Sequence, residues 1–527
     1  MKNQMNIGKI IKTQATRNPD AIALINTVHG VDQQCSFSEL DKKSAKAAAL
    51  LHQQGFKPGD AILVFLPVSI DLYVTLIAIF RLGLVAMFID PSAGRAHITH
   101  CCNLHAPQGF IGTTKSHLLR LLSPALRRIP HKFFIGVYVP AAINWRSTNT
   151  TIANNDIIHR NTNDPALITF TSGSTGSPKG AVRSHGFLIA QHQALQTNLA
   201  LKAGQIDLST LPIFVLANLA SGVTSLIPDT DLRRPANIDA KKVFQQIKRF
   251  NPDRTAASPA FYECLIKYCQ QHEYTLSSFK QIYTGGAPVF PKLLAELKRL
   301  TPEGEVIAVY GSTEAEPIAH ITYSEISTED IQAMMSGKGL LTGAPVSCIS
   351  LQIIKMQWGN VLMPYDENDF KNEALPENKV GEIVVSGEHV LQGYLKGIGD
   401  EETKFTVGTQ RWHRTGDAGY LDSQGRLWLM GRCAALINDE KGYLYPFAVE
   451  SAALHFPGVY RAALIQHRDT RLLLVQEEHK GDCVIKSLFD VLAWAELDEI
   501  RVIGSIPMDK RHNAKIDYPA LLKNLGN

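Results

Sequence analysis

Residues 168–180, with the sequence I-T-F-T-S-G-S-T-G-S-P-K-G, join an apolar, β-branched start to a run of small and hydroxylated residues. The start predicts a buried strand, and the run predicts a loop that closes on Pro178, Lys179 and Gly180. Glycines 173, 176 and 180 allow the backbone to turn with positive φ. Successive N–H groups in such a turn bind anions, and the lysine adds a point charge suited to phosphate. We therefore expect a phosphate-binding loop.

The string from Thr171 to Gly180 does not fit the Walker pattern, and an ordinary surface loop would explain its glycines alone. As a whole, it resembles the signature loop of the adenylate-forming enzymes: acyl-CoA synthetases, peptide synthetase adenylation domains and luciferases. These enzymes convert a carboxylate and ATP into an acyl-adenylate and pyrophosphate, then pass the acyl group to an acceptor. The resemblance implies that ATP is a cofactor and that Thr171 and Lys179 are catalytic residues. The ATP-binding residues that it implies in this loop are Thr171, Ser172, Gly173, Ser174, Thr175, Gly176 and Lys179.

Length and composition are those of a globular protein with more than one domain. A chain of 527 residues is too long to fold around one compact core. A net charge of +4 without a long basic run argues against nucleic-acid binding. Eight cysteines without a C-x-x-C pair argue against zinc and disulfides and favour a cytoplasmic location. The most apolar region, residues 61–89, is interrupted by Pro67, Asp71 and Arg81. We therefore expect no integral membrane segment.

Strand and helix patterns alternate along the first part of the chain. A strand over 61–66, a helix over 70–82 and a strand over 85–89 indicate βαβ units and a largely parallel sheet. With the resemblance, this pattern implies an α/β fold whose large N-terminal adenylation domain, residues 1–432, has mixed sheets flanked by helices and a small barrel-like subdomain. Residues 433–527 are expected to form a small, mobile α+β C-terminal domain that carries the terminal lysine motif.

Residues 306–314, V-I-A-V-Y-G-S-T-E, form a second diagnostic stretch, in which a buried strand turns sharply at Gly311. Alone, the string could be any strand-to-turn segment. Together with the phosphate loop, it places Tyr310 against the base, Thr313 on phosphate and Glu314 on Mg²⁺. Mg²⁺ prefers one or two carboxylates together with substrate phosphates, so a single acid suffices. The expected ATP-binding residues here are Tyr310, Gly311, Ser312 and Thr313, and Glu314 is the expected metal ligand and a catalytic residue.

Two further segments are expected to line the nucleotide and the acyl group. Gly286, Ala287 and Pro288 follow an apolar strand and resemble the segment that lies along the adenine ring. The apolar run from residue 211 to residue 227 lies where the superfamily lines its acyl pocket, although plain core is an equal interpretation for any one residue in it. The expected pocket residues are Phe214, Ala217, Gly222, Gly285 and Gly311.

The remaining motifs lie in the last quarter of the chain. Residues 413–417, H-R-T-G-D, resemble the motif whose aspartate binds both ribose hydroxyls, because a carboxylate accepts two such bonds at once. For Gly416-Asp417 alone, an aspartate in a hairpin turn is the alternative. Arg432, at the expected domain boundary, would contact the ribose or the phosphates. Lys515 lies in a string that resembles the terminal motif, and its charge would offset charge that develops during adenylation.

Several other stretches resemble the olefin β-lactone synthetases, which adenylate a long β-hydroxy acid and close it to a lactone without coenzyme A. Ala434 stands where many superfamily members carry Asp or Lys at the domain hinge, and residues 437–442 replace the usual I-K-x-x-G. These departures weigh against the domain rotation that builds a thiolation site. Ala217 and Asn218 replace residues that are usually bulkier in this branch. The stretches that carry the resemblance are residues 211–214, 225–236, 286–289 and 511–516.

Three hypotheses follow from these motifs. The leading one is an enzyme that forms an acyl-adenylate of a long-chain β-hydroxy acid and then a β-lactone, with ATP and Mg²⁺ as cofactors. The second is a ligase that delivers a fatty or amino acid to coenzyme A, a carrier protein or an amine. The third is a non-catalytic nucleotide-binding protein, against which the retention of Lys179, Glu314, Asp417 and Lys515 argues. Pathway enzymes or an acyl carrier are candidate protein partners.

Overall fold

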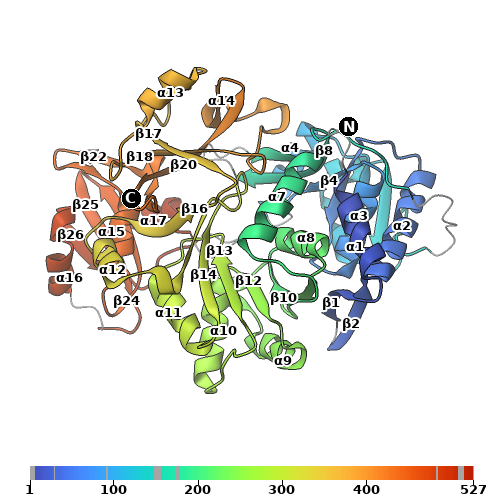
Figure 1. The fold of residues 1–527 in the computed structure, drawn as a ribbon, viewed down its shortest axis with the longest axis horizontal. Helices are drawn as coiled ribbons and strands as arrows, with labels where there is room; N and C mark the ends of the chain where they lie inside the picture. Colours follow the sequence, from blue (N-terminus) through green and yellow to red (C-terminus); the bar gives the residue numbers. More distant parts are fainter. Residues whose placement is uncertain are drawn as a thin grey trace. The chain divides into compact units, whose positions relative to one another are not determined.

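The computed structural model describes residues 6–28, 30–90, 93–147, 156–172, 178–481, 485–508 and 515–525 (Figure 1). Its contacts divide the chain into two compact units. Unit 1 comprises Met1–Asp229 and Glu388–Glu401, and unit 2 comprises Thr230–Gly387 and Glu402–Asn527. Among the described helices, none combines the length and the apolar character that a membrane crossing requires.

Unit 1 contains a seven-stranded sheet in the order β7-β6-β5-β3-β4-β8-β9. All neighbouring strands are parallel except β8 and β9, which form an antiparallel hairpin. Helices alternate with the parallel strands, as the βαβ prediction requires. The strands are β3 (Ala61–Phe65), β4 (Val85–Phe88), β5 (Gly109–Thr113), β6 (His131–Ile135), β7 (Ile143–Asn144), β8 (Pro165–Ser172) and β9 (Pro178–Ser184), and the helices between them are α3 (Ile70–Arg81), α4 (Arg95–Leu104), α5 (Thr114–Leu122) and α6 (Pro124–Arg128).

The second group of strands in unit 1 follows the order β10-β11-β1-β2. Strand β11 lies parallel to both β10 and β1, and β1 pairs with β2 in antiparallel fashion. Helices α1, α7 and α8 pack against one another. The elements are β1 (Ile22–Val28), β2 (Val31–Ser36), β10 (Ile206–Ser209), β11 (Thr224–Ile227), α1 (Ile7–Arg17), α2 (Phe37–Gln53), α7 (His185–Asn198) and α8 (Pro212–Ser221).

Unit 2 begins with three parallel strands, β12, β13 and β14, and continues through antiparallel pairs to β17. Aromatic residues fill the core beside the antiparallel part, among them Phe370, Phe405 and Trp412. The strands are β12 (Arg254–Ala257), β13 (Gln281–Gly285), β14 (Glu305–Tyr310), β15 (Ala319–Thr322), β16 (Leu340–Pro345), β17 (Ser350–Ile354), β18 (Gly381–Ser386), β19 (Lys404–Val407), β20 (Gln410–Leu421) and β21 (Leu427–Arg432), and the helices are α9 (Ala240–Phe250), α10 (Pro259–Gln271), α11 (Pro291–Leu300), α12 (Thr328–Met335), α13 (Glu367–Glu373) and α14 (Asp400–Thr403).

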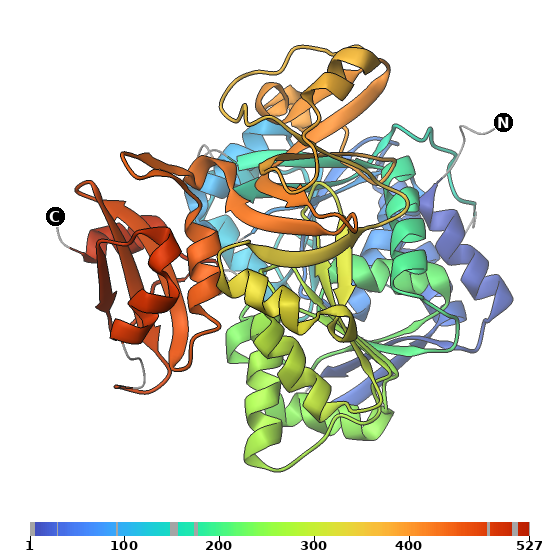
Figure 2. The same ribbon diagram turned by 60° about the vertical axis from the view of Figure 1, so that its left-hand side comes forward.

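The last part of unit 2 has a three-stranded sheet of its own, in the order β24-β25-β26, with helices packed on it (Figure 2). Residues that alternate along its strands form two separate apolar clusters. The predicted boundary at residue 432 stays a prediction. The elements are β22 (Ile437–Asp439), β23 (Gly442–Leu444), β24 (Val459–His467), β25 (Thr470–Glu477), β26 (Glu499–Val502), α15 (Pro446–Ala453), α16 (Ile485–Val491) and α17 (Tyr518–Asn524).

Candidate active site

The expected phosphate loop joins the two strands of the β8–β9 hairpin in unit 1. Thr171 pairs with Lys179, and Ser172 pairs with Pro178. Pro178 and Lys179, which we predicted at the end of the loop, therefore belong to strand β9. Gly180 also lies in β9 and does not have the positive φ that we predicted for it. A side chain there would meet Cβ of Leu395 at 3.0 Å, so this glycine permits close packing rather than a turn. Gly173, Ser174, Thr175, Gly176 and Ser177 lie outside the described residues.

Lys179 is held inside unit 1 rather than on an exposed loop. Only 6% of the residue is exposed, and its Nζ lies 5.9 Å from the centre of the Tyr394 ring. Gly399 makes room for it, because a Cβ atom added there would lie 2.6 Å from Cδ of the lysine. A compact ammonium group is a point charge suited to phosphate, and the predicted role of Lys179 in binding ATP stays a prediction.

In unit 2, three of the predicted nucleotide residues meet at Asp417. Tyr310 donates its hydroxyl to Oδ2 of Asp417 at 2.6 Å, and Nη1 of Arg432 lies 3.2 Å from Oδ1. Asp417 and Arg432 are directly paired in neighbouring strands, β20 and β21. The hairpin-turn alternative is therefore wrong, since Asp417 lies within the twelve-residue strand β20. We call Tyr310, Asp417 and Arg432 the carboxylate cluster.

The electrostatics of the carboxylate cluster favour a neutral tyrosine and a charged arginine. Burial and the neighbouring Asp417 raise the pKa of Tyr310 well above its usual value, so this hydroxyl stays a donor. The Asp417 carboxylate, in turn, raises the pKa of Arg432. An ionised carboxylate offers about four acceptor positions, of which these two partners use two. Asp417 thus retains acceptor capacity for two ribose hydroxyls, although its side chain is only 14% exposed.

Glu314 lies in a tight turn after strand β14. The N–H of Ser312 donates to the carbonyl of Ala315 at 2.7 Å, and the Ser312 hydroxyl accepts from the N–H of Glu314 at 3.2 Å. A Cβ at Gly311 would lie 3.1 Å from the carbonyl oxygen of Ala315, which explains the glycine there. Glu314 carries a half-buried carboxylate in this turn, the donor type that Mg²⁺ prefers together with phosphates.

His413 is a polar neighbour of Glu314 that the sequence analysis did not select. Burial, followed by the charge of Lys404, lowers the pKa of His413 to about 3, while the charge of Glu314 acts in the opposite direction. Its Nδ1–H donates to the carbonyl of Thr403 at 3.2 Å, which leaves Nε2 as an acceptor. Its place in the H-R-T-G-D string was the only signal for it in the sequence.

The predicted adenine segment and the Gly311 turn follow neighbouring parallel strands in unit 2. Gly285, at the end of β13, pairs with Val309 of β14, and a Cβ there would lie 2.6 Å from the Val309 carbonyl oxygen. Gly286 then turns the chain with a φ of +78° before Ala287 and Pro288. Because the carboxyl ends of parallel strands meet at one sheet edge, these residues and Tyr310 emerge at the same edge.

The predicted acyl-pocket residues are divided between the two units. Phe214 and Ala217 are buried on α8, and Ala217 lines a cavity of about 10 Å³ between α1, α7 and α8. Gly222 caps the end of α8 in the left-handed conformation, with a φ of +76°, which is a structural role. Gly285 and Gly311 belong to unit 2. Their common role in an acyl pocket stays a prediction.

Lys515 is exposed and precedes helix α17. Its neighbour Ile516 forms an antiparallel bridge with Met508, which brings the two ends of the terminal motif together. The motif residues between them, 509–514, lie outside the described residues. The structure therefore places the lysine on the surface of the last part of unit 2, where it could meet a ligand.

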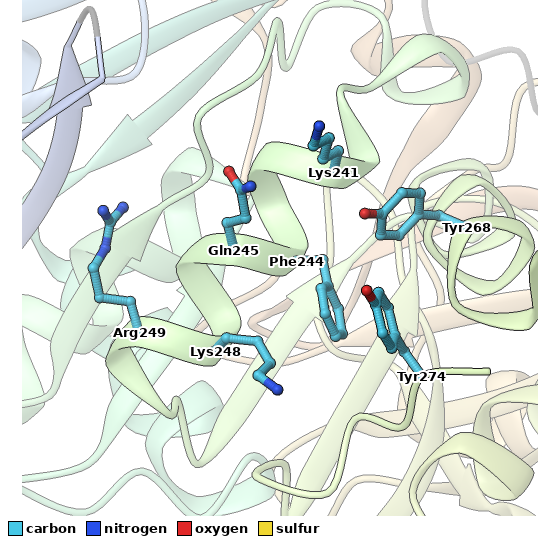
Figure 3. A pocket seen from close by; sticks show the side chains of 7 residues that line it. All are labelled: Lys241, Phe244, Gln245, Lys248, Arg249, Tyr268 and Tyr274. Carbon is cyan, nitrogen blue, oxygen red and sulfur yellow. The ribbon is translucent and has the colours of Figure 1, made fainter. Parts of the chain in front are cut away.

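A separate hollow of about 450 Å³ lies on unit 2, between α9 and the end of α10 (Figure 3). The rings of Phe244 and Tyr274 stack in it, with centroids 4.4 Å apart and planes at 2°. Lys241, Lys248 and Arg249 also line it. Among the described residues, none of those predicted for adenylation lines this hollow.

The sequence of residues 11–395 matches the family model described as AMP-binding enzyme. The chain belongs to this family. Olefin beta-lactone synthetases from Stenotrophomonas maltophilia and Xanthomonas campestris are each 30% identical to it, over 98% of this chain and 97% and 96% of theirs. The ATP-bound crystal structure of MatB from Rhodopseudomonas palustris superposes with a TM-score of 0.81 at 19% identity, over 99% of both chains. This similarity confirms the predicted mixed α/β fold with large N-terminal sheets and a small C-terminal domain.

Membership of this family also confirms the predicted enzyme class. The protein is an adenylate-forming ligase that activates a carboxylic acid with ATP. Within the described part of the chain, no cluster of three or more His, Cys, Asp or Glu side chains is suited to a metal ion.

Proposed function

We propose that this ligase adenylates a β-hydroxy acid and then closes it to a β-lactone, without coenzyme A. The observation that carries the proposal is the 30% identity to two olefin beta-lactone synthetases over nearly the full length of each chain. Ala434 adds support, because the resemblance implies Asp or Lys at this hinge position in many superfamily members, and this chain has alanine there. In this proposal, the domain movement that serves coenzyme A is dispensable.

In the first step, a carboxylate oxygen of the acid attacks the α-phosphorus of ATP, and pyrophosphate leaves. Asp417 accepts hydrogen bonds from the ribose hydroxyls, with Tyr310 and Arg432 holding its carboxylate in place. Lys179 offsets charge on the phosphates at the loop. Lys515 offsets the charge that develops on the attacking carboxylate and on the leaving pyrophosphate. Charges fixed in advance act without reorganisation during the reaction, which makes them effective.

Glu314 is the residue that would hold Mg²⁺, together with oxygens of the ATP phosphates. When bound, the ion would neutralise phosphate charge and favour departure of pyrophosphate. The carboxylate of Glu314, in the turn after β14, fits this role, since Mg²⁺ usually keeps several waters and few protein ligands. Glu314 does not need a second protein carboxylate beside it.

Glu314→Gln should raise the Mg²⁺ concentration needed for half-maximal adenylation by about 10-fold or more. Even the loss of a group that only hydrogen-bonds to a metal ligand typically lowers metal affinity by about 10-fold or more. The amide keeps the shape of the side chain but loses its negative charge. The measurement is a Mg²⁺ titration of carboxylate-dependent pyrophosphate–ATP exchange. Glu303→Gln, at an exposed position before β14, is the matched control and should titrate like the parent enzyme. Identical curves for Glu314→Gln and the parent would remove Glu314 from the metal site.

In the second step, the β-hydroxyl oxygen attacks the carbonyl carbon of the adenylate, its proton passes to a base, and AMP leaves. The attacking group belongs to the same molecule as the carbonyl carbon. Effective molarities of well-oriented intramolecular groups reach ~10⁵–10⁸ M, although strain in a four-membered ring offsets part of this advantage. The site must also exclude water, since water would hydrolyse the adenylate.

An oxygen-labelling experiment tests this order of steps. An acid with ¹⁸O in both carboxylate oxygens should transfer one label to AMP and keep the other in the lactone carbonyl. The ring oxygen should carry no label, because it comes from the β-hydroxyl. A lactone that retains both labels, together with unlabelled AMP, would mean that the hydroxyl rather than the carboxylate is activated. That result would contradict the proposed second step.

A further inference from the structure

The small sheet β24-β25-β26 carries a different helical layer on each face. One apolar cluster contains Val449 of α15 and Leu488 of α16 with Leu464 and Leu473 of the sheet. The other contains Leu521 of α17 with strand residues that alternate with those of the first. Side chains at alternate positions of a strand point to opposite faces. The helix that follows Lys515 therefore packs on the face opposite to α15.

Glu450 connects these two layers. It lies on α15, is 5% exposed, and its Oε1 accepts from the N–H of Leu464 at 2.9 Å. The same oxygen accepts the hydroxyl of Tyr518, the first residue of α17, at 2.5 Å. Leu464 belongs to β24, which is an edge strand. The carboxyl group thus lies at the edge of the sheet and joins helices that cover its opposite faces.

At one end, this connection begins at the carboxylate cluster. Helix α15 packs against β21, the strand that ends with Arg432. Gly431 has a φ of +127°, and a Cβ there would lie 2.7 Å from Cβ of Phe447 on α15. Such close contact leaves little freedom between the strand and the helix. The position of Glu450 is therefore set relative to Arg432 and Asp417.

At the other end, the connection reaches the terminal lysine. Tyr518 follows Lys515 by three residues, and the N–H of the intervening Asp517 donates to the carbonyl of Pro507 at 2.9 Å. Ile516 bridges to Met508. Asp517 also caps α17 by accepting from the N–H of Ala520 at 3.0 Å. The backbone on the C-terminal side of Lys515 is therefore fixed to Pro507 and Met508 and leads directly into Tyr518, whose hydroxyl Glu450 holds.

We propose that Glu450 is a positioning residue for Lys515, and that it acts through the hydrogen bond from Tyr518. The proposal rests on the role in adenylation given to Lys515 above. Burial raises the pKa of Glu450 to about 7, against the opposing effect of its two hydrogen bonds. A buried carboxyl group is costly, whereas an apolar side chain could fill the same space. A role in aligning Lys515 would explain why a carboxyl group, that of Glu450, lies where α15, β24 and α17 meet.

The test separates adenylation, which uses Lys515, from consumption of the adenylate, in which the proposed mechanism gives Lys515 no part. Tyr518→Phe and Glu450→Leu should lower carboxylate-dependent pyrophosphate–ATP exchange by about 10- to 100-fold, the scale of a small misplacement far from the reacting atoms. The rate of AMP release from supplied acyl-adenylate should stay within about twofold of the parent rate, because the proposed mechanism assigns Lys515 to the first half-reaction alone. Glu450→Gln keeps an oxygen acceptor and should retain the parent exchange rate.

Ile500→Val is the matched control for a purely structural effect. Ile500 belongs to the cluster on the α15 face, and the change removes one methylene group, at a cost of stability but without contact to Tyr518. It should leave both half-reactions at parent rates. If Tyr518→Phe slows both half-reactions equally, or slows neither, Glu450 does not position Lys515. Tyr518→Phe alone decides the matter if Glu450→Leu fails to fold. Parent-rate exchange by Lys515→Ala would instead overturn the role of the lysine itself, independently of Glu450.

Discussion

Lys515→Ala should lower carboxylate-dependent pyrophosphate–ATP exchange by about 100- to 1000-fold. We assign to Lys515 the positive charge that offsets negative charge on the attacking carboxylate and on the leaving pyrophosphate. Removing one fixed donor of this kind typically raises the activation free energy by ~2.7–4 kcal/mol. Its exposed position before α17 is compatible with contact to a ligand. The affinity for ATP should change little, because the assigned interaction strengthens in the transition state.

Lys523→Ala is the matched control for this prediction. Lys523 is an exposed lysine near the end of α17, and its removal changes the net charge by the same amount. It should exchange pyrophosphate at the parent rate. Parent-like exchange by Lys515→Ala with every active acid would show that the lysine has no part in adenylation.

Asp417→Ala should raise the Kd for ATP by about 100-fold or more. The ribose would lose two hydrogen bonds to a charged acceptor, each worth ~1.5–3 kcal/mol. Calorimetric titration with ATP measures the effect, and circular dichroism checks that the fold survives the change. The second check matters because the change also leaves Tyr310 and Arg432 without the carboxylate that they contact.

Glu377→Ala provides the control for loss of a negative charge, since Glu377 is an exposed acid on the same unit. Its affinity for ATP should equal that of the parent. If Asp417→Ala retains the fold and binds ATP as tightly as the parent does, Asp417 does not bind the ribose. The carboxylate cluster would then be a structural feature of strands β20 and β21.

The parts of the fold that the sequence predicted well are those set by local patterns. The strand–helix–strand pattern over residues 61–89 became β3, α3 and β4, because apolar runs of these lengths bury fully in a parallel sheet. Such features depend on neighbours in sequence and need no knowledge of the tertiary structure.

Contacts between distant residues could not be predicted in this way. Tyr310 and Asp417 are 107 residues apart, and their hydrogen bond depends on the path of the chain through β15 and β16. The register of β20 with β21 shifts between Ala418 and Gly419, and an irregularity of this kind has no clear mark in one sequence. The same holds for Glu450 and Tyr518, which are 68 residues apart.

Gly180 shows how a correct residue can be assigned for the wrong reason. We predicted a positive φ, whereas the glycine lies in β9 and makes space for Leu395. The partner in that contact lies more than two hundred residues further along the chain. Glycine is needed either for a special backbone angle or for a close approach, and only the structure distinguishes the two.

The central claim is that the β-hydroxyl of the substrate, and not a thiol, accepts the acyl group. It is tested most directly by mass spectrometry of the products formed from matched β-hydroxy and plain fatty acids with ATP and Mg²⁺, each with and without coenzyme A. The β-hydroxy acid should give β-lactone and AMP in equal amounts whether or not coenzyme A is present, and the plain acid should stop at bound adenylate. Efficient thioester formation from the plain acid, with no lactone from any β-hydroxy acid, would contradict the claim.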